Sequence, residues 1–590
     1  MRLGISTSLA VCLLLAFTDA FALKLDVSVD GLEGKWQENV LALLAIYQER
    51  EDETLTAPRL KVLHRLAPEQ IRQALAPFGL YRVQVTDSLT PPAQDGGPWH
   101  AQYRVDPGEP IKIGVVNYSV TGPGAENPAF PQSFPMKVGD VLLHADYEKA
   151  KGDITYAASQ DGYLDFELVR HQVLIDPVAY EAIIEFHIDT GKQYFIGDVR
   201  FKQVPEFLND EFLHRYVKVE PGAVYDPDIL IGLQSRLLGT EYFEKVEMVP
   251  LKGEANDTSV IPIEVVTYRN KANKFRVGIG YATDVGPRLT LDWRRRYLGR
   301  NGHKFRLELS IAQAVQELSG DYRIPVGNLL TDYLTIQPQF QSYDTATRVG
   351  DLAQVQMAYS VVTPGGWRRT AGIDYRYEEY TLNDVDADTT NELVPNISWA
   401  KTVADDPIYT TKGYRIKYTI LGAVEGLVSQ ASYISGLIKF KYVRQFMKDY
   451  RFITRTELGA TYADSVEDLP ASRRFYAGGD SSIRGWGIEA LGPNNELDQT
   501  VGGRYLAVGS LELERRIKGD WSGAVFTDFG NAFDPDYPRE WQQSVGVGLR
   551  WKSPLGQVRM DVAFALTKGD EETTYGLPPA RLHLVIGPDL

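Results

Sequence analysis

The chain has almost no cysteine and, beyond its first residues, no long apolar run. Its only cysteine among 590 residues is Cys12, which falls in a short apolar segment near the N-terminus. An intrachain disulfide and a cysteine-based metal site are therefore excluded. No stretch after residue 22 approaches 18 apolar residues, so no transmembrane helix is predicted there.

Catalytic motifs are also missing. The sequence has no His-Glu-x-x-His, no Gly-x-Ser-x-Gly elbow and no phosphate-binding loop. Its eight histidines stand at isolated positions such as His64, His171 and His303. The net charge of −16 argues against a nucleic-acid partner. These absences predict a protein that is not an enzyme and that has no catalytic residue, no metal site and no other cofactor.

The N-terminus has the pattern of a secretory signal. Arg2 supplies the positive end, residues 9–17 form the apolar run, and Ala20-Phe21-Ala22 is a small-x-small cleavage site. We predict that residues 1–22 are removed on export; an uncleaved anchor is the alternative. The mature chain would then have no thiol.

Residues 23–270 contain an internal repeat. Tyr-Arg-Val-Asp-Pro-Gly at 103–108 recurs as Phe-His-Ile-Asp-Thr-Gly at 186–191, which gives a period of 83 residues. Phe-Gly-Leu-Tyr-Arg-Val at 78–83 recurs at 161–166 with the same step, and a looser third copy lies at 239–246. The predicted modules are 23–108, 109–192 and 193–270.

Each module is predicted to run strand, helix, helix, strand, strand. Helical spacing is visible at 68–75 and 145–151, and Asp226 before Pro227 is typical of a helix start. A small mixed sheet covered by helices on one face leaves an edge strand free to pair with an extended peptide. The alternative is that the modules are only spacers.

From Lys274 onward a two-residue alternation replaces the helical spacing. Phe275, Val277, Ile279 and Tyr281 share one face of the first such segment, and charged residues and glycines occupy the other. Apolar side chains on the outward face and charged side chains on the inward face indicate an antiparallel transmembrane barrel over 274–590, with about sixteen strands. A soluble sandwich is the alternative, but its core could not hold so many charges. One connection, 462–502, is much longer than the rest.

That long connection carries the most specific motif, Ile483-Arg484-Gly485-Trp486, with Gly478, Gly479 and Gly487 nearby. Downstream lies Phe526-Thr527-Asp528-Phe529-Gly530. The two motifs, with the module array before them, resemble the superfamily of outer-membrane assembly factors that includes BamA, TamA and the two-partner secretion transporters, and the modules resemble its POTRA domains. Trp486 stands where the family more often has Phe or Tyr.

The resemblance implies that the long loop folds into the barrel and that Arg484 contacts Asp528 on the barrel wall. Glu512 and Glu514, on the preceding strand, are secondary candidates for the same contact. The expected role is to hold the loop in the lumen and brace the wall.

The C-terminal strand ends in Gly587-Pro588-Asp589-Leu590, without the usual terminal aromatic. Gly587 and Pro588 pair poorly in a sheet, and Gly278 and Gly280 weaken the first strand, near Phe275. The seam between the last and first strands is therefore predicted to be short and weak, a candidate lateral gate. Ordinary barrel variation is the alternative.

Three modules, the chain length and the Gly-Pro ending resemble the TamA branch. This implies an outer-membrane protein of a Gram-negative bacterium, with its modules in the periplasm. Its expected partners are the lipid bilayer, unfolded outer-membrane protein clients such as autotransporters, and a TamB-like protein that spans the periplasm. The alternatives are a two-partner secretion pore and a general barrel-assembly subunit. A passive porin is disfavoured by the module array, and an all-β surface enzyme by the missing catalytic site.

Overall fold

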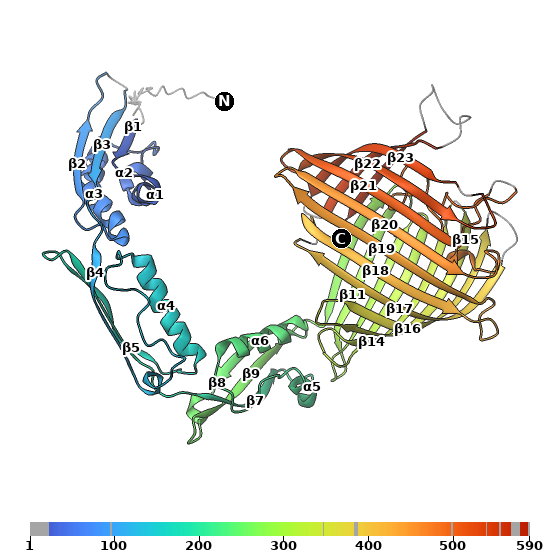
Figure 1. The fold of residues 1–590 in the computed structure, drawn as a ribbon, viewed down its shortest axis with the longest axis horizontal. Coiled ribbons are helices and arrows are strands. Elements are labelled where there is room, and N and C mark those ends of the chain that lie inside the picture. The colour runs from blue at the N-terminus through green and yellow to red at the C-terminus, as the bar shows by residue number, and fades with distance from the viewer. Residues whose placement is uncertain are drawn as a thin grey trace, which may run out of the picture. The chain divides into compact units, whose positions relative to one another are not determined.

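The computed structural model describes residues 23–587 except 95–96, 346, 383–387, 407, 497–498, 539, 554–555 and 568–578 (Figure 1). The predicted signal, with Cys12, lies outside the described residues, as does Pro588. Contacts divide the chain into two compact units. One contains the chain up to Asp198 with Val219–Ile231 and Pro250–Ile263; the other contains Val199–Lys218, Gly232–Val249 and the chain from Glu264.

Three small three-stranded sheets form the N-terminal region, and in each the last strand of the module lies in the middle. The first has the order β1-β3-β2, the second β4-β6-β5 and the third β7-β9-β8. The first module contains β1 (Leu25–Asp30), α1 (Gly34–Leu43), α2 (Ala45–Gln48), α3 (Ala57–Leu75), β2 (Gln84–Thr90) and β3 (Trp99–Asp106). The second contains β4 (Lys112–Thr121), α4 (His144–Gln160), β5 (Glu167–Asp176) and β6 (Glu181–Asp189). The third contains β7 (Phe195–Val204), α5 (Asp210–His214), α6 (Pro227–Gly239), β8 (Phe243–Pro250) and β9 (Val260–Arg269).

The second module departs from the predicted order, because it has one α-helix, α4, where two were expected. A single 3₁₀ turn, Pro123–Ala125, stands in the place of the first helix. Gly122, Pro123, Gly124, Pro128 and Pro131 crowd this segment. Proline removes backbone donors and glycine raises the entropy cost of a helix, so a regular helix does not form there.

The junctions between modules repeat with the sequence period. The Ile111 amide donates to the Gly79 carbonyl at 2.8 Å, and the Leu142 amide donates to the Ile111 carbonyl at 3.0 Å. The same two bonds recur 83 positions further along the chain. The Tyr194 amide donates to the Gly162 carbonyl at 2.8 Å, and the Tyr225 amide donates to the Tyr194 carbonyl at 2.9 Å. Gly79 and Gly162 both have φ of 80°, and a Cβ on either would lie under 3 Å from a carbonyl oxygen of the next module. Glycine is therefore required at both junctions.

Sixteen antiparallel strands close into a barrel in sequence order, which confirms the predicted fold class. They are β10 (Asn273–Ala282), β11 (Gly286–Leu298), β12 (His303–Ala312), β13 (Val315–Pro325), β14 (Tyr333–Asp344), β15 (Arg348–Val362), β16 (Arg368–Leu382), β17 (Asp388–Ala404), β18 (Lys412–Ala423), β19 (Tyr433–Phe446), β20 (Tyr450–Tyr462), β21 (Tyr505–Lys518), β22 (Trp521–Phe533), β23 (Gln542–Ser553), β24 (Gly556–Ala565) and β25 (Ala580–Gly587).

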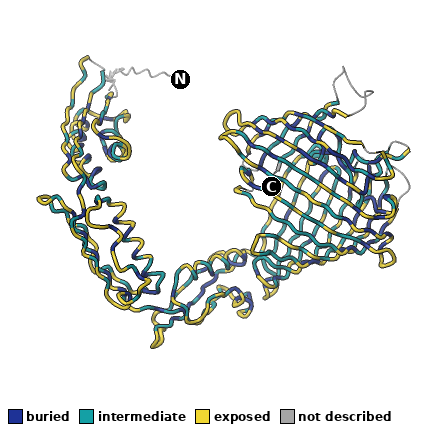
Figure 2. Tube along the Cα trace, in the orientation of Figure 1, coloured by how far each residue is buried: buried dark blue, intermediate teal, exposed yellow. Residues whose placement is uncertain are grey.

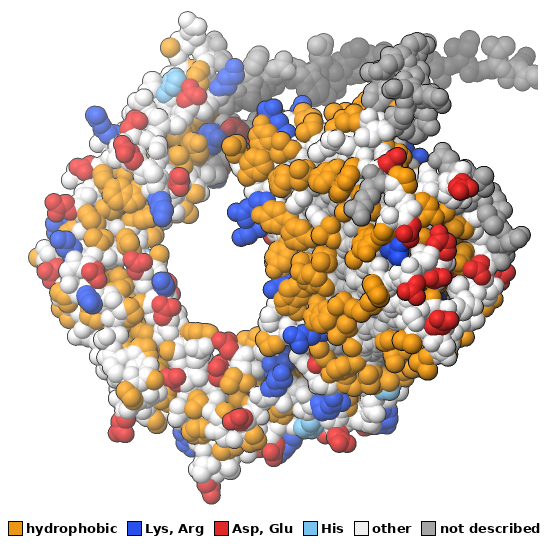
Figure 3. Space-filling view, turned by 45° about the vertical axis from the view of Figure 1, so that its right-hand side comes forward, with side chains coloured by type: hydrophobic (Ala, Val, Ile, Leu, Met, Phe, Trp, Pro, Cys, Tyr) orange, Lys and Arg blue, Asp and Glu red, His pale blue; other side chains and the backbone are white. Residues whose placement is uncertain are grey.

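The outer face of the barrel is apolar. Exposed and covered residues alternate along its strands (Figure 2), and hydrophobic side chains cover a broad area of the barrel face seen in Figure 3. On β10, Phe275 is 71%, Val277 68% and Ile279 85% exposed. Such a surface suits lipid, in which a closed sheet satisfies the backbone hydrogen bonds. Among the described residues, no helix is long and apolar enough to cross a membrane.

The third module is bonded directly to the barrel through the turn between β11 and β12. Tyr242 donates its hydroxyl to the Gly302 carbonyl at 2.5 Å, and the Asn209 amide donates to the Arg300 carbonyl at 2.9 Å. A Cβ on Gly302 would lie 2.5 Å from the Phe212 ring. Tyr242 is fully buried, and burial raises its pKa. The phenol therefore stays a neutral donor at this junction.

Candidate functional site

Residues 463–504 join β20 to β21, and their central part packs against the inner barrel wall. Ile483 is fully buried and Trp486 is 8% exposed. Both belong to a hydrophobic cluster that includes Leu506 on β21 and Ala565 on β24. Gly485, with φ of 103°, adopts a backbone conformation that favours glycine. The loop thus has a small core of its own, shared with the wall.

Arg484 lies at the centre of this contact and is 3% exposed. Its Nε donates to Asp528 Oδ2 at 2.7 Å and its Nη2 donates to Asp528 Oδ1 at 2.9 Å, a two-pronged pairing on β22. The Arg484 backbone amide also donates to Asp528, at 3.1 Å. The guanidinium carbon stands 3.3 Å from the centre of the Phe526 ring, which adds a cation–π contact.

Two further carboxylates meet the same guanidinium. Arg484 Nη1 donates to Glu512 Oε2 at 2.9 Å and to Asp561 Oδ2 at 3.0 Å. Arg550, itself fully buried, forms ion pairs with both of these carboxylates. Buried charges are tolerated only when each is paired in this way. The network therefore joins the loop to β21, β22, β23 and β24.

Glu514 does not contact Arg484, although the sequence suggested it as a secondary partner. It accepts a hydrogen bond from Arg451 Nε at 2.7 Å and lies 3.3 Å from Arg550 Nε. The side chain of Glu514 lies two residues along β21 from Glu512, on the same face, so it binds the neighbouring arginines. The sequence therefore predicted the correct strand for Glu514 but not its partner.

The loop is also tied to other parts of the wall. Arg348, the first residue of β15, donates to Glu489 Oε1 at 2.7 Å. Arg473 donates to Glu392 on β17 at 3.0 Å. These contacts lie on strands far from β21–β24 in the barrel order. The loop therefore spans the lumen and is bonded on both sides of it.

The seam between the first and last strands is nearly unpaired. In the described part of the chain, β10 and β25 share one register pair, Ala282 with Val585, whereas β10 pairs with β11 over its whole length. The Thr283 amide adds a bond to the Leu584 carbonyl at 3.2 Å. Both contacts lie at the end of β10 that is farther from the modules. Along Asn273–Tyr281, which includes Gly278 and Gly280, no pairing with β25 is present.

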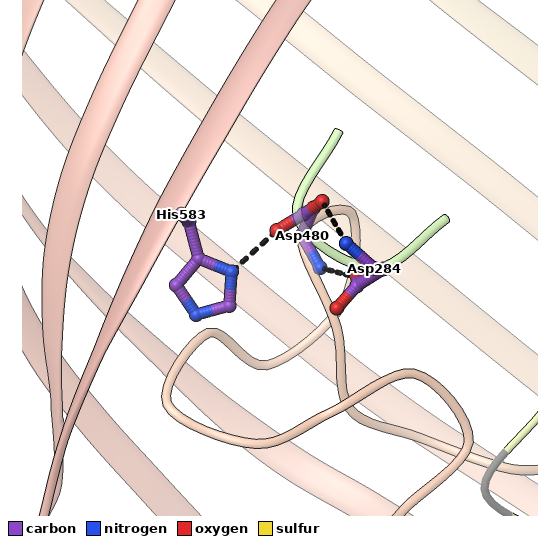
Figure 4. Close-up of side chains that lie close together, drawn as sticks. All are labelled: Asp284, Asp480 and His583. Carbon is purple, nitrogen blue, oxygen red and sulfur yellow. Dashed lines mark hydrogen bonds and ion pairs between the residues drawn. The ribbon is translucent and has the colours of Figure 1, made fainter. Parts of the chain in front are cut away.

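Three side chains join the two sides of the seam to the loop (Figure 4). Asp284 follows β10, Asp480 belongs to the loop, and His583 lies on β25. His583 Nδ1 hydrogen bonds to Asp480 Oδ1, and the backbone amides of Asp284 and Asp480 each donate to the other's carboxylate. We call Asp284, Asp480 and His583 the clasp. Arg581 supports it through a bond to Asp284 Oδ1 at 3.4 Å.

The clasp brings together ligand types that could hold a metal ion. Both ring nitrogens of His583 are already engaged, however, because Nε2 lies 3.0 Å from the Gly485 amide, which donates to it. Nδ1 must then carry the proton that is shared with Asp480. The geometry fits a hydrogen-bonded link better than a metal site, because a metal ion would displace these bonds.

Several participants were not found from the sequence. Asp561, Arg550 and the three clasp residues carry no local signal, because each lies far along the chain from a partner. Asp561 lies 77 positions from Arg484 and Arg550 lies 38 from Glu512. Asp480 lies 103 positions from His583 and 196 from Asp284. Gly587 pairs with Gln557 on β24 and not with β10. Only the barrel register brings these groups together.

Comparisons with known proteins agree with this architecture. The family model described as the Omp85 superfamily domain matches residues 269–587, and the POTRA domain TamA domain 1 matches residues 26–107. The outer membrane protein assembly factor BamA of Nitratidesulfovibrio vulgaris is 24% identical over 387 residues, which cover 61% of this chain and 47% of that protein. BamA of Neisseria meningitidis serogroup B is 20% identical over 511 residues, 74% of this chain and 62% of that protein. The chain therefore spans about half to three fifths of these relatives.

A solved structure shares the fold. The crystal structure of BamA from Haemophilus ducreyi lacking POTRA domains 1–3 has a TM-score of 0.70 and 16% sequence identity, and the match covers 81% of this chain and 99% of that one. At this identity the likeness shows the architecture: POTRA-type modules followed by a barrel.

Replacing Arg484 should loosen the loop. Arg484→Ala leaves Asp528, Glu512 and Asp561 without the cation that they share, which we expect to cost about 3–5 kcal/mol. The folded, fast-migrating form in heat-modifiability gels should be lost at a lower temperature than in the wild type, while the protein still reaches the membrane. The control is Arg369→Ala, since Arg369 is exposed on β16. Equal unfolding temperatures for the two variants would contradict the bracing role.

Removing the clasp carboxylate should open the seam. In Asp480→Ala, the hydrogen bonds that the Asp480 carboxylate makes with His583 and with the Asp284 amide are lost. The bond from the Asp480 amide to Asp284 and the Arg484 network are kept. We expect the amides of Thr283 and Leu584 to exchange at least tenfold faster in hydrogen–deuterium exchange. Ser481→Ala, at an exposed neighbouring position, is the control. Unchanged exchange in Asp480→Ala would show that the register pair Ala282–Val585 holds this end of the seam without the clasp.

Proposed function

Because the chain belongs to the Omp85 superfamily, we propose that it is an assembly factor that helps to insert or secrete β-barrel proteins such as autotransporters. The barrel lies in the outer membrane and the POTRA modules lie in the periplasm. The observation that carries the proposal is the seam, at which β10 pairs with β25 at a single position. The activity requires no bond-making chemistry and no cofactor.

The unpaired edge of β10 offers a template for a client strand. Backbone groups along Asn273–Tyr281 can pair with an incoming extended segment, as in β-augmentation. Unpaired backbone groups are costly in lipid, so a client strand that pairs there gains stability. Phe275, Val277 and Ile279 keep the outer side of this edge apolar. The edge thus fits a partly folded barrel strand entering from the periplasmic side.

The loop and the clasp give the seam a defined closed end. Arg484 fixes the loop to β21–β24, and the clasp connects that loop to β10 and β25. The far end of the seam is therefore held while the end nearer the modules is free. Opening would begin at the free end and proceed toward Ala282.

We further propose that the chain works with a TamB-like partner. Support comes from its first module, which matches the TamA domain 1 model over residues 26–107, and from the three-module array. The partner would bind an edge strand of a module sheet. β2 and β5 are such edges, with Ser88 and Val169 exposed on them.

Photocrosslinking tests the partner. A photoreactive residue at Ser88 or Val169 should capture a TamB-type protein in cells, because an added strand would lie against that edge. The same residue at Lys149, exposed on α4, is the control. If neither edge position captures a TamB-type protein, the assignment to the TamA branch is wrong.

A disulfide across the seam tests the assembly function. Ala282→Cys with Val585→Cys places two thiols at directly opposed positions, and the only native cysteine is Cys12. When oxidised, this pair should reduce surface assembly of an autotransporter at least tenfold, and reductant should restore it. The matched control is Gly278→Cys with Thr290→Cys, an opposed pair inside the continuous β10–β11 ladder. Full assembly with the seam pair oxidised would assign the work to the modules, with the barrel as an anchor.

A further inference from the structure

Basic side chains stand opposite one another on three neighbouring barrel strands. Between β18 and β19, Arg415 is in register with Lys441, and Lys417 with Lys439. Lys441 is in turn opposite Arg455 on β20. Like charges directly opposite in a sheet destabilise it. A chain with a net charge of −16 has therefore gathered cations where they repel one another.

These side chains line a cavity of about 380 Å³ in the lumen. Arg559 reaches it from β24, and the loop residues Asp480 and Ser481 also border it. Six cationic side chains and two carboxylates, those of Glu457 and Asp480, lie in the lining. Glu457 pairs with Lys439 at 3.1 Å, and Asp480 belongs to the clasp. Both carboxylates are thus already engaged.

Three of the lining cations, Arg415, Lys417 and Arg559, differ from Arg484 and Arg550, whose guanidinium groups both meet carboxylates. In the described part of the chain, Arg415 and Lys417 have no hydrogen bond or ion pair. Arg559 has a buried Nε without an acceptor. Arg455 has a 3.3 Å bond to Ser510 and a distant approach to Asp528, at 3.8 Å. Positive charge from β18 and from β24 is therefore left uncompensated in the lining of the cavity.

We propose that this cavity binds a phosphate-bearing anion. A phosphate group offers several acceptor oxygens and up to two negative charges, so it can bridge arginines and lysines from different strands. The cavity volume is in the range of small-molecule sites, large enough for inorganic phosphate or for a phospholipid headgroup. A bound phosphate would offset the repulsion between the two opposed pairs, Arg415 with Lys441 and Lys417 with Lys439.

Isothermal titration of the full chain in a neutral detergent tests the site. The probes are inorganic phosphate, dihexanoyl phosphatidylglycerol as a soluble phospholipid, and hexaglutamate as an acidic peptide. The double variant Arg415→Gln/Lys417→Gln should bind the phosphate probes at least tenfold more weakly than the wild type. Lys149→Gln/Lys218→Gln, which removes the same charge from exposed module positions, should bind as the wild type does.

The outcomes separate the sources of the anion. Tighter binding of the phospholipid than of phosphate identifies a headgroup site, and equal binding identifies a site for the free anion; both support the proposal. Absent phosphate binding, equal binding by the double variant, or binding of hexaglutamate alone would overturn it. The double variant should stay folded, since it removes repulsion and no observed bond, and its heat-modifiable migration checks this.

Discussion

Backbone hydrogen bonding around a closed ring of strands is the constraint on which the rest of this structure depends. In lipid, every backbone amide and carbonyl needs a partner. Fifteen neighbouring strand pairs satisfy this with ladders of eight or more register pairs, and the β10–β25 junction has one. The fold therefore concentrates its unsatisfied backbone at one place. The loop and the clasp are arranged around that place.

The lumen is divided electrostatically. On β21–β24, carboxylates and arginines are matched in a buried network that joins Arg484 to the wall. On β18–β20, cations face cations across the strands. The first is neutralised by the chain itself, whereas Arg415 and Lys417 on β18 have no ion pair among the described residues. The same barrel interior thus has a wall that fixes the loop and a wall that is open to an external anion.

Local patterns were sufficient for much of the architecture. The 83-residue period predicted a repeated α/β module, alternation predicted the barrel, and the motifs around Arg484 and Asp528 led to a contact that the structure contains. The missing helix of the second module was hidden because helical spacing elsewhere in the repeat suggested a regular unit. Asp561, Arg550 and the clasp could not be found, since their partners depend on strand register and on how deeply the loop enters the lumen. Glu514 shows the same limit, since its strand was predicted but its partners, Arg451 and Arg550, were not.

The repeated junctions have a consequence for how such chains diversify. Gly79, Ile111 and Leu142 form the same backbone bonds as Gly162, Tyr194 and Tyr225. The bonds use main-chain atoms and one glycine, so they place little demand on the other side chains of each module. Gain or loss of one whole repeat by recombination would bring equivalent main-chain atoms together at the new junction. The number of modules can therefore change while the main-chain bonds of each junction between modules stay the same.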